Sequence, residues 1–269
     1  MALEDDFTDI LGKAQRGWNL DDAEVARRAG VELDDWISLK QGKTNEAALS
    51  KVAPVLHLNL PALSAIANGR YTPSPVPAIE GLQSFQTDFH GMKVNSHLAW
   101  DPATREAAIF DTGADARPIL DFAASRGLTV KNIFLTHSHS DHVHDLGRLC
   151  RKTAAPAWVG DREPIDGART FPAGRIFHIG GLPLETRSTI GHSRGGTTYV
   201  LLGLACPVAI VGDAVFAGSM GGGAFSYKDA LATNRSEILT LPDETILCPG
   251  HGPPTTVGEQ KTANPFLAS

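Results

Sequence analysis

The chain has 269 residues and a formal net charge of −6, and 42% of its residues are hydrophobic and 20% charged, values typical of a globular protein. The acidic balance argues against nucleic-acid binding, because phosphate backbones are bound through clustered lysine and arginine. The acidic first residues differ from a signal peptide, no apolar run is long enough to span a membrane, and the three scattered cysteines form no CxxC pair. We therefore expect a cytoplasmic protein without a membrane partner.

The first seventy residues have the pattern of several short helices. Apolar side chains recur at helical spacing from Phe7 to Ala14, and Gly30 and Gly69 stand where a glycine commonly follows a helix. Helices are predicted over residues 7–18, 22–29, 33–41, 44–56 and 59–68. We assign residues 1–70 to a small all-α domain.

A proline-rich segment comes next. Three prolines in the seven residues from Tyr71 to Pro77 predict a stiff, extended linker, which we assign to residues 71–83. Beyond it the pattern changes to β-like runs at 84–89, 107–110, 130–135, 197–202 and 208–211, with helical patterns at 114–126, 144–153 and 226–239. Strands that alternate with helices predict a layered α/β domain over residues 84–269.

The stretch Thr-His-Ser-His-Ser-Asp-His at residues 136–142 directly follows one of these predicted strands. His137 and His139 are two positions apart, so in an extended chain their imidazoles point to the same side. Asp141 and His142 follow where a turn can direct them toward a second centre. Neutral imidazole binds zinc and iron, and carboxylate suits harder ions such as manganese. These four residues therefore predict a site for one or two metal ions.

Three further candidate ligands lie downstream, each at the edge of a predicted strand and bordered by glycine. They are His192 in Thr189–Thr197, Asp213 after Val211-Gly212, and His251 in the loop Cys248–Pro253. Ligands brought together on loops from several strand ends are a common way to build an active site. The remaining histidines are expected to be structural: His57, His90, His97, His144 and His178.

These stretches together resemble the metallo-β-lactamase superfamily, and most of all its glyoxalase II-like thioester hydrolases. The matching segments are THSHSDH at 136, TIGHSRGGT at 189, GDAVFAGS at 212 and LCPGHGPPTTVGEQKTANPF at 247. The resemblance covers residue 84 to the end of the chain. It implies a four-layer αββα sandwich, here preceded by the small all-α domain.

The resemblance also implies a two-metal site, with zinc as the expected ion and iron or manganese as alternatives. By this likeness the first metal is bound by His137, His139 and His192, the second by Asp141, His142 and His251, and Asp213 bridges the two. The implied activity is hydrolysis of a thioester or related small ester by a metal-bridging hydroxide, as in hydroxyacylglutathione hydrolases. Asp141 would be the catalytic residue that orients the hydroxide and accepts its proton. A mononuclear-iron persulfide dioxygenase, which shares most of these ligands, is the alternative.

The loop after Ser219 departs from the glyoxalase II-like pattern. Similar enzymes usually place an arginine or lysine there for anionic thiol cofactors, whereas residues 220–227 are glycine-rich and uncharged. The run Gly221–Gly223 is either a mobile lid or a tight turn. Few residues follow His251, so the glutathione-binding helical domain of full-length glyoxalase II enzymes is not expected. The substrate-binding residues stay unassigned.

The helical front end resembles the helix-turn-helix domain of Cro and repressor proteins, with residues 23–31 as the second helix and turn and 33–41 as the recognition helix. A recognition helix reads bases with its N-terminal residues, but here that end carries Glu32, Asp34 and Asp35. Residues 1–52 hold eleven acidic and seven basic side chains, a net charge of −4. A metal-sensing DNA-binding regulator therefore remains only a rival hypothesis. We expect the helices to mediate homodimerisation or to cover the mouth of the active site.

Overall fold

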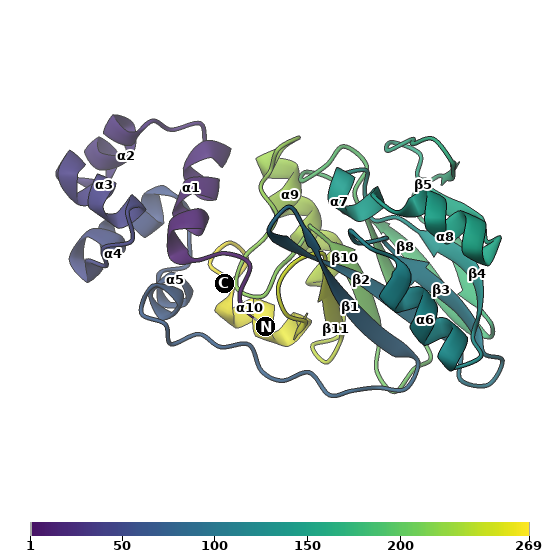
Figure 1. Ribbon diagram of the computed structural model, residues 1–269. Helices are drawn as coiled ribbons and strands as arrows, with labels where there is room; N and C mark the ends of the chain where they lie inside the picture. Colours follow the sequence, from purple (N-terminus) through teal and green to yellow (C-terminus); the bar gives the residue numbers. More distant parts are fainter. Residues whose placement is uncertain (1, 269) are drawn as a thin grey trace.

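The N-terminal part of the chain is a unit of five helices in the computed structural model, which describes residues 2–268 (Figure 1). They are α1 (Phe7–Gly17), α2 (Asp22–Ala29), α3 (Leu33–Lys40), α4 (Glu46–Val55) and α5 (Leu60–Ala67). All but α3 begin after an aspartate or asparagine whose side chain accepts a hydrogen bond from a first-turn amide. Gly30 adopts the left-handed conformation that ends α2. The predicted helices are thus present, because their start and stop signals are local.

Two six-stranded sheets form the rest of the described fold. The first has the order β1 (Leu82–Phe89), β2 (Met92–Trp100), β3 (Glu106–Phe110), β4 (Thr129–Phe134), β5 (Ala157–Gly160) and β6 (Ala168–Phe171). The second has the order β12 (Thr255–Thr256), β11 (Ile246–Pro249), β10 (Val208–Gly212), β9 (Thr197–Leu201), β8 (Leu182–Ser188) and β7 (Ile176–Ile179). The pairs from β3 to β6 are parallel, as is β10 with β11. Parallel neighbours end at the same edge of their sheet, so the loops that follow them lie close together.

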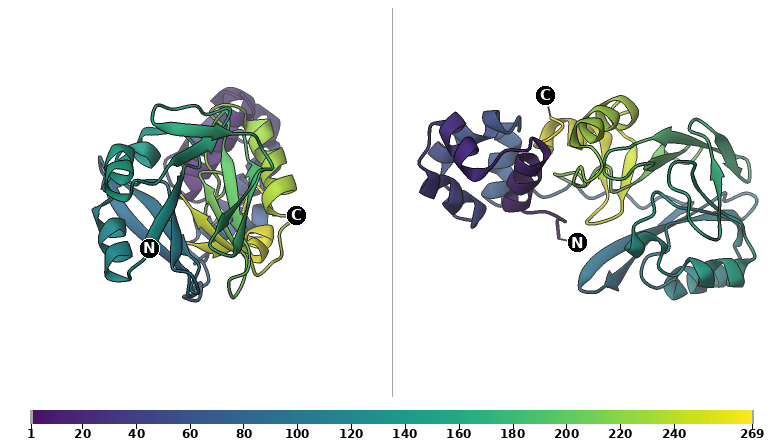
Figure 2. Two further views of the ribbon diagram at one scale, coloured as in Figure 1. Left: turned by 90° about the vertical axis from the view of Figure 1, so that its right-hand side faces the viewer. Right: turned by 90° about the horizontal axis from the view of Figure 1, so that it is seen from above.

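The two sheets pack face to face and each is covered by helices on its outer side (Figures 1 and 2). Aromatic side chains such as Phe110, Phe134 and Tyr199 fill the space between the sheets. The first sheet buries Ile109 and Ile133 against α6 (Arg117–Ser125) and α8 (Leu146–Thr153), and the single-turn α7 (Ser140–Val143) lies just before α8. The second sheet is covered by α9 (Tyr227–Thr233), the π-helix η1 (Asn234–Ile238) and α10 (Val257–Ala263). The predicted αββα sandwich is confirmed.

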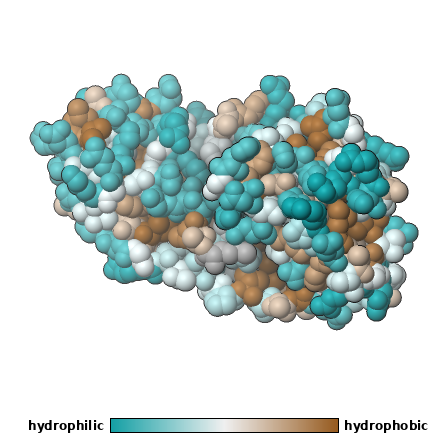
Figure 3. Space-filling view, in the orientation of Figure 1, coloured by the Kyte–Doolittle hydropathy of each residue, from teal (hydrophilic) through white to brown (hydrophobic). Residues whose placement is uncertain are grey.

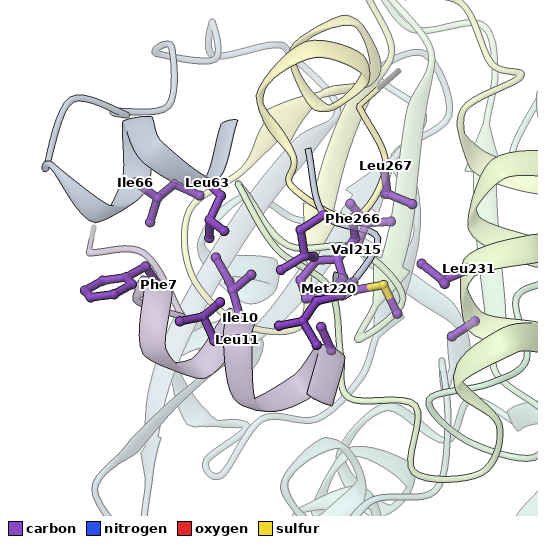
Figure 4. Close-up of a cluster of buried hydrophobic side chains, with 14 of the residues drawn as sticks. Phe7, Ile10, Leu11, Leu63, Ile66, Val215, Met220, Leu231, Phe266 and Leu267 are labelled. Carbon is purple, nitrogen blue, oxygen red and sulfur yellow. The ribbon is translucent and has the colours of Figure 1, made fainter. Parts of the chain in front are cut away.

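The five-helix unit packs on the outer layer of the second sheet and shares its hydrophobic core. Ile10 and Leu11 of α1 meet Val215, Met220 and Phe266 in one cluster of buried side chains (Figure 4). Two close contacts fix this interface. A Cβ on Gly17 would lie 2.2 Å from the ring of Tyr227, and the amide of Asn59 donates to the carbonyl oxygen of Pro265 at 2.7 Å. Burying this apolar surface favours a fixed position for the unit.

Several elements differ from the sequence predictions. Strand β2 was not predicted, because its buried polar residues Asn95, Ser96 and His97 hide the alternation that marks a strand. The predicted helix at 144–153 is preceded by α7, and the one at 226–239 changes to a π-helix at Asn234.

Among the described residues, no helix is both long and apolar enough to cross a bilayer. Hydrophilic residues predominate on the visible face of the five-helix unit (Figure 3).

Candidate metal centre

The predicted metal ligands gather where strands of both sheets end. The loop after β4 carries the histidine-rich stretch, Asp213 directly follows β10, and His251 lies just beyond β11. His192 stands in the loop between β8 and β9. The structure brings all seven predicted ligands together in two groups, His137, His139, His192 and Asp213 in one and Asp141, His142 and His251 in the other. The sequence analysis expected the same two sets of three, with Asp213 as a bridge between them, and here Asp213 falls in the first group.

The first group has the spacing of a single metal site. Nδ1 of His139 lies 3.0 Å from Nε2 of His137 and 2.9 Å from Nε2 of His192. Nε2 of His192 also lies 3.3 Å from Oδ2 of Asp213. Two nitrogens bound tetrahedrally to zinc stand about 3.3 Å apart, given metal–nitrogen distances of about 2.0–2.1 Å. One ion would therefore fit among these donor atoms with small adjustments.

The second group is equally compact, and Asp213 lies between the two. Oδ2 of Asp141 is 3.2 Å from Nε2 of His251 and 3.3 Å from Nε2 of His142. Oδ1 of Asp213 is 3.3 Å from Nε2 of His142, and its Oδ2 is 3.5 Å from Nε2 of His251. Because Oδ2 of Asp213 also faces His192, this carboxylate can contact ions in both groups.

The buried donor atoms have the chemistry of a cation site. Within residues 2–268, Nε2 of His142 and Oδ1 of Asp213 are buried without a hydrogen-bond partner, which is costly unless an ion satisfies them. Burial lowers the pKa of His142, but Asp213 and Asp111 outweigh it and raise that pKa to about 10. Burial likewise lowers the pKa of His251, and hydrogen bonds to Asp141 and Asp213 raise it to about 11. The carboxylates thus stabilise positive charge here, which protons or metal ions can supply, so the donor set fits divalent metals.

Neighbouring groups orient the histidine ligands. Nδ1 of His142 lies 2.8 Å from Oδ2 of Asp111, and the Asp111 carboxylate also accepts hydrogen bonds from the amide and hydroxyl of Thr136. Nδ1 of His251 donates to the Lys93 carbonyl oxygen at 2.6 Å, and Nδ1 of His192 donates to that of Gly222 at 3.0 Å. Such contacts fix the ring tautomer and leave Nε2 for the metal.

Comparison with known proteins decides the family. A sequence profile described as "Metallo-beta-lactamase superfamily" matches residues 91–251. The chain belongs to the metallo-beta-lactamase superfamily. It is similar to the probable metallo-hydrolase YqgX of Bacillus subtilis, with 30% identity over 60% of this chain and 87% of that one. It is also similar to the hydroxyacylglutathione hydrolase GloC of Haemophilus influenzae, with 28% identity over 65% of this chain and 93% of that one.

Two solved structures have a similar fold. ETHE1 from Myxococcus xanthus aligns with a TM-score of 0.61 and 26% identity, covering 69% of this chain and 84% of its own. TTHA1623, in a form described as di-iron-bound, aligns with a TM-score of 0.56 and 25% identity, covering 68% of this chain and all of its own. By family, the protein is thus a metal-dependent hydrolase. Part of its chain has no counterpart in TTHA1623.

Asp141, the predicted catalytic residue, is a buried member of the second ligand group. Burial raises the pKa of its carboxyl, but His251 and His142 outweigh this and hold the pKa below its usual value. The carboxylate is therefore ionised near neutral pH, the form that binds a metal ion. Its catalytic role stays a prediction.

The glycine loop of the superfamily member packs tightly against the metal ligands. The amide of Gly221 donates to the carbonyl oxygen of Asp213 at 3.1 Å. A Cβ on Gly221 would lie 2.0 Å from that oxygen, and one on Gly223 would lie 2.3 Å from Cα of Tyr227. Nζ of Lys13 donates to the carbonyl oxygen of Met220 at 2.9 Å. These contacts favour the tight turn over the mobile lid, because at two positions only glycine avoids a clash.

Two hollows open beside the metal centre and share His139 and His192. One has a volume of about 530 Å³ and contains Arg162, Arg194 and Phe225 in its lining. The other, of about 390 Å³, is lined by Asp141 and His251 and also by Glu4, Lys13, Met92 and Phe216. A substrate whose reacting bond lies at the metals would therefore extend in two directions.

The sequence analysis missed several residues that surround the metal ligands. Asp111 directly follows the predicted strand 107–110, just as Asp213 directly follows β10. Its place after a β-run could therefore have marked it as a candidate site residue. Glu163, which accepts hydrogen bonds from Ser138 and from the amide of Gly195 at 2.8 Å, carried no such signal. The five histidines expected to be structural lie outside both ligand groups. Of these, His97 contacts the Pro249 carbonyl oxygen at 3.2 Å and so supports the loop of His251.

Proposed function

We propose that this protein is a binuclear metal-dependent hydrolase of a thioester or related small ester. The observation that carries the proposal is the pair of complete ligand groups with Asp213 between them. The alternative, a single-iron persulfide dioxygenase, shares most of these ligands but would hold no second ion at Asp141, His142 and His251, so the metal content distinguishes the two. The likeness to a protein named hydroxyacylglutathione hydrolase supports thioester chemistry.

In this proposal each residue of the donor set has a role. When bound, two divalent ions supply a water of lowered pKa and polarise a carbonyl oxygen. His137, His139 and His192 would hold one ion, and Asp141, His142 and His251 the other. The Asp141 carboxylate would orient the attacking water and accept its proton. A thiolate leaves with little acid assistance, because a free thiol has a pKa of about 8.5.

The arginine-lined hollow supports an anionic thiol carrier. Among the described residues, the guanidinium groups of Arg162 and Arg194 form no hydrogen bond or ion pair, and Arg194 stacks 5.1 Å from the ring centre of Phe225. Glu163, buried between Ser138 and Gly195, fixes the loop that carries Arg162. These two cations would supply the positive charge that the glycine loop lacks. Guanidinium groups bind carboxylate and phosphate well.

The rival role, DNA binding by the helical unit, has little electrostatic support. The exposed start of α3 presents Glu32, Asp34 and Asp35, and the ammonium of Lys40 is paired with Asp22 at 2.7 Å. A DNA phosphate would meet these acids first. Homodimerisation through the helices remains part of our proposal.

Metal analysis with thioesterase kinetics tests the proposal. The purified protein should hold about two zinc, iron or manganese ions per chain and should hydrolyse glutathione or coenzyme A thioesters. Asp213→Ala should lose both metal and activity, whereas the control Asp166→Ala, an exposed loop carboxylate, should keep both. Full activity of metal-free protein would overturn the proposal, and oxygen uptake with a glutathione persulfide instead of thioester hydrolysis would favour the dioxygenase.

Substitution of the two arginines tests the carrier site. Arg162→Ala and Arg194→Ala should raise KM severalfold for thioesters of anionic thiols and leave KM unchanged for a thioester of an uncharged thiol. Arg169→Ala is the matched control. Arg169 is also an exposed arginine, and its guanidinium lies over the ring of Trp158, away from the hollow. Equal effects on both kinds of thioester would refute an electrostatic role.

A further inference from the structure

The segment before α1 and α1 itself reach the metal centre. Glu4 and Lys13 line the hollow of about 390 Å³ together with Asp141 and His251. Both residues lie outside the stretch 91–251 that matches the superfamily. One wall of the site is therefore built from a part of the chain that the family match does not include.

That wall is held rigidly. Asp5 is ion-paired with Lys13 and also accepts a hydrogen bond from the Ser219 hydroxyl at 2.5 Å. The Lys13 ammonium donates to the Met220 carbonyl oxygen and lies 5.1 Å from the ring centre of Phe216. Ile10 and Leu11 of the same helix pack with Val215 and Met220 in the shared hydrophobic core (Figure 4). The unit cannot withdraw from the hollow without breaking buried polar contacts.

The charge of the wall is unbalanced at Glu4. Asp5 neutralises Lys13, whereas the Glu4 carboxylate forms no hydrogen bond or ion pair with any residue from 2 to 268. Glu4 is half-buried, and its backbone lies against Gly252, where an added Cβ would be 3.1 Å from the Glu4 nitrogen. Burial raises the pKa of Glu4, and the nearby His251 opposes that shift. A free acceptor carboxylate therefore faces the hollow beside the second ligand group.

We propose that Glu4 determines substrate specificity, and that its hollow takes the acyl group of the substrate and selects acyl chains with a hydroxyl or ammonium group. This inference rests on the proposed thioester hydrolase function. The arginine-lined hollow would hold the carrier on the other side of His139 and His192, which both hollows share. The Glu4 carboxylate accepts a hydrogen bond from a donor on the acyl chain, and it repels an acyl chain that ends in a carboxylate.

Binding of hydroxamic acids tests this inference without catalysis. Acetohydroxamic, 2-hydroxypropionohydroxamic and succinohydroxamic acids present the same metal-binding group and differ only in the acyl part. Their dissociation constants would be measured by calorimetry on the zinc-loaded full chain, for wild type, Glu4→Gln and Glu4→Ala. Glu32→Gln is the matched control, because this exposed acid of the helical unit lies at the start of α3 and lines neither hollow.

We expect the wild type to prefer the 2-hydroxy compound, and Glu4→Ala to reduce that preference by about tenfold, the scale of one hydrogen bond to a charged group. Both Glu4 variants should bind the succinyl compound severalfold more tightly than wild type does. Unchanged ratios among the three compounds in both variants, with unaltered melting temperatures, would overturn the inference. A wild type that binds selectively but cleaves no thioester would instead refute only the proposed function.

Discussion

Replacing Gly221 with alanine should damage the metal centre without touching a metal ligand. The new methyl group would lie 2.0 Å from the Asp213 carbonyl oxygen and 2.7 Å from Nδ1 of His192. To reach an ordinary contact of 3.4 Å, the Asp213 carbonyl and the loop must separate by about 1.4 Å. That movement breaks the hydrogen bond from the Gly221 amide to this oxygen.

The cost can be estimated from these contacts. The lost hydrogen bond is worth about 1 kcal/mol, and overpacking at a tight site costs about 1–3 kcal/mol. Because Asp213 and His192 are both predicted ligands, the strain also misaligns the donors. Disturbing the groups that orient ligands typically lowers metal affinity by about 10–100-fold. We expect an effect of that size for Gly221→Ala.

Gly222→Ala is a matched control one residue away. A Cβ at this position has no heavy atom within 4 Å, and the carbonyl oxygen that accepts from His192 is retained. Zinc affinity would be measured by competition with a chelator, and zinc content by elemental analysis after dialysis. Gly221→Ala should lose affinity while Gly222→Ala matches wild type. Wild-type zinc affinity in Gly221→Ala would refute the packing argument, and equal losses in both variants would show that loop flexibility matters instead.

Three further predictions concern the groups around the site. Asp111→Asn should weaken metal binding by about 10–100-fold, because it removes the charge that faces Nδ1 of His142 at 2.8 Å; a zinc titration that matches wild type would contradict this. The pKa values of His142 and His251 in the metal-free protein are raised to about 10 and 11, so zinc must displace protons at pH 7. Zinc affinity should therefore fall as pH falls, and zinc addition should release protons. A zinc affinity that is constant from pH 6 to 9 would rule this out. Burial lowers the pKa of His97 to about 4 from its ordinary value of 6.5. Between these pH values the unfolded chain binds the extra proton, so the free energy of unfolding should decrease as pH falls. At pH 5 the loss in free energy of unfolding amounts to about 2 kcal/mol. Urea denaturation of the metal-free protein at pH 5 and 7 should therefore show a smaller pH dependence of this free energy in His97→Gln than in wild type. An equal pH dependence in both proteins would contradict the assignment of the effect to His97.

The helices and the fold class followed largely from local signals. Asp21 and Asn45 each accept a hydrogen bond from the first-turn amide three residues ahead, and these contacts need no distant partner. The strands were harder to predict. In β2, Leu98 packs toward the outer helices and Ala99 toward the other sheet, so neighbouring positions are buried alike. An alternating pattern arises only where one face meets water.

The sequence by itself determined the metal chemistry, because the donor type of each side chain is intrinsic and four of them fall within residues 137–142. Only the tertiary structure decided what surrounds those donors. Glu4 and Arg194 lie 190 positions apart in the chain, yet they line hollows that meet at His139 and His192. Neither carries a local pattern, since their proximity to the metals depends on how α1 and the strand-end loops pack. The candidate ligands were therefore predicted from residue chemistry and the family resemblance, whereas the walls of the two hollows depend on packing.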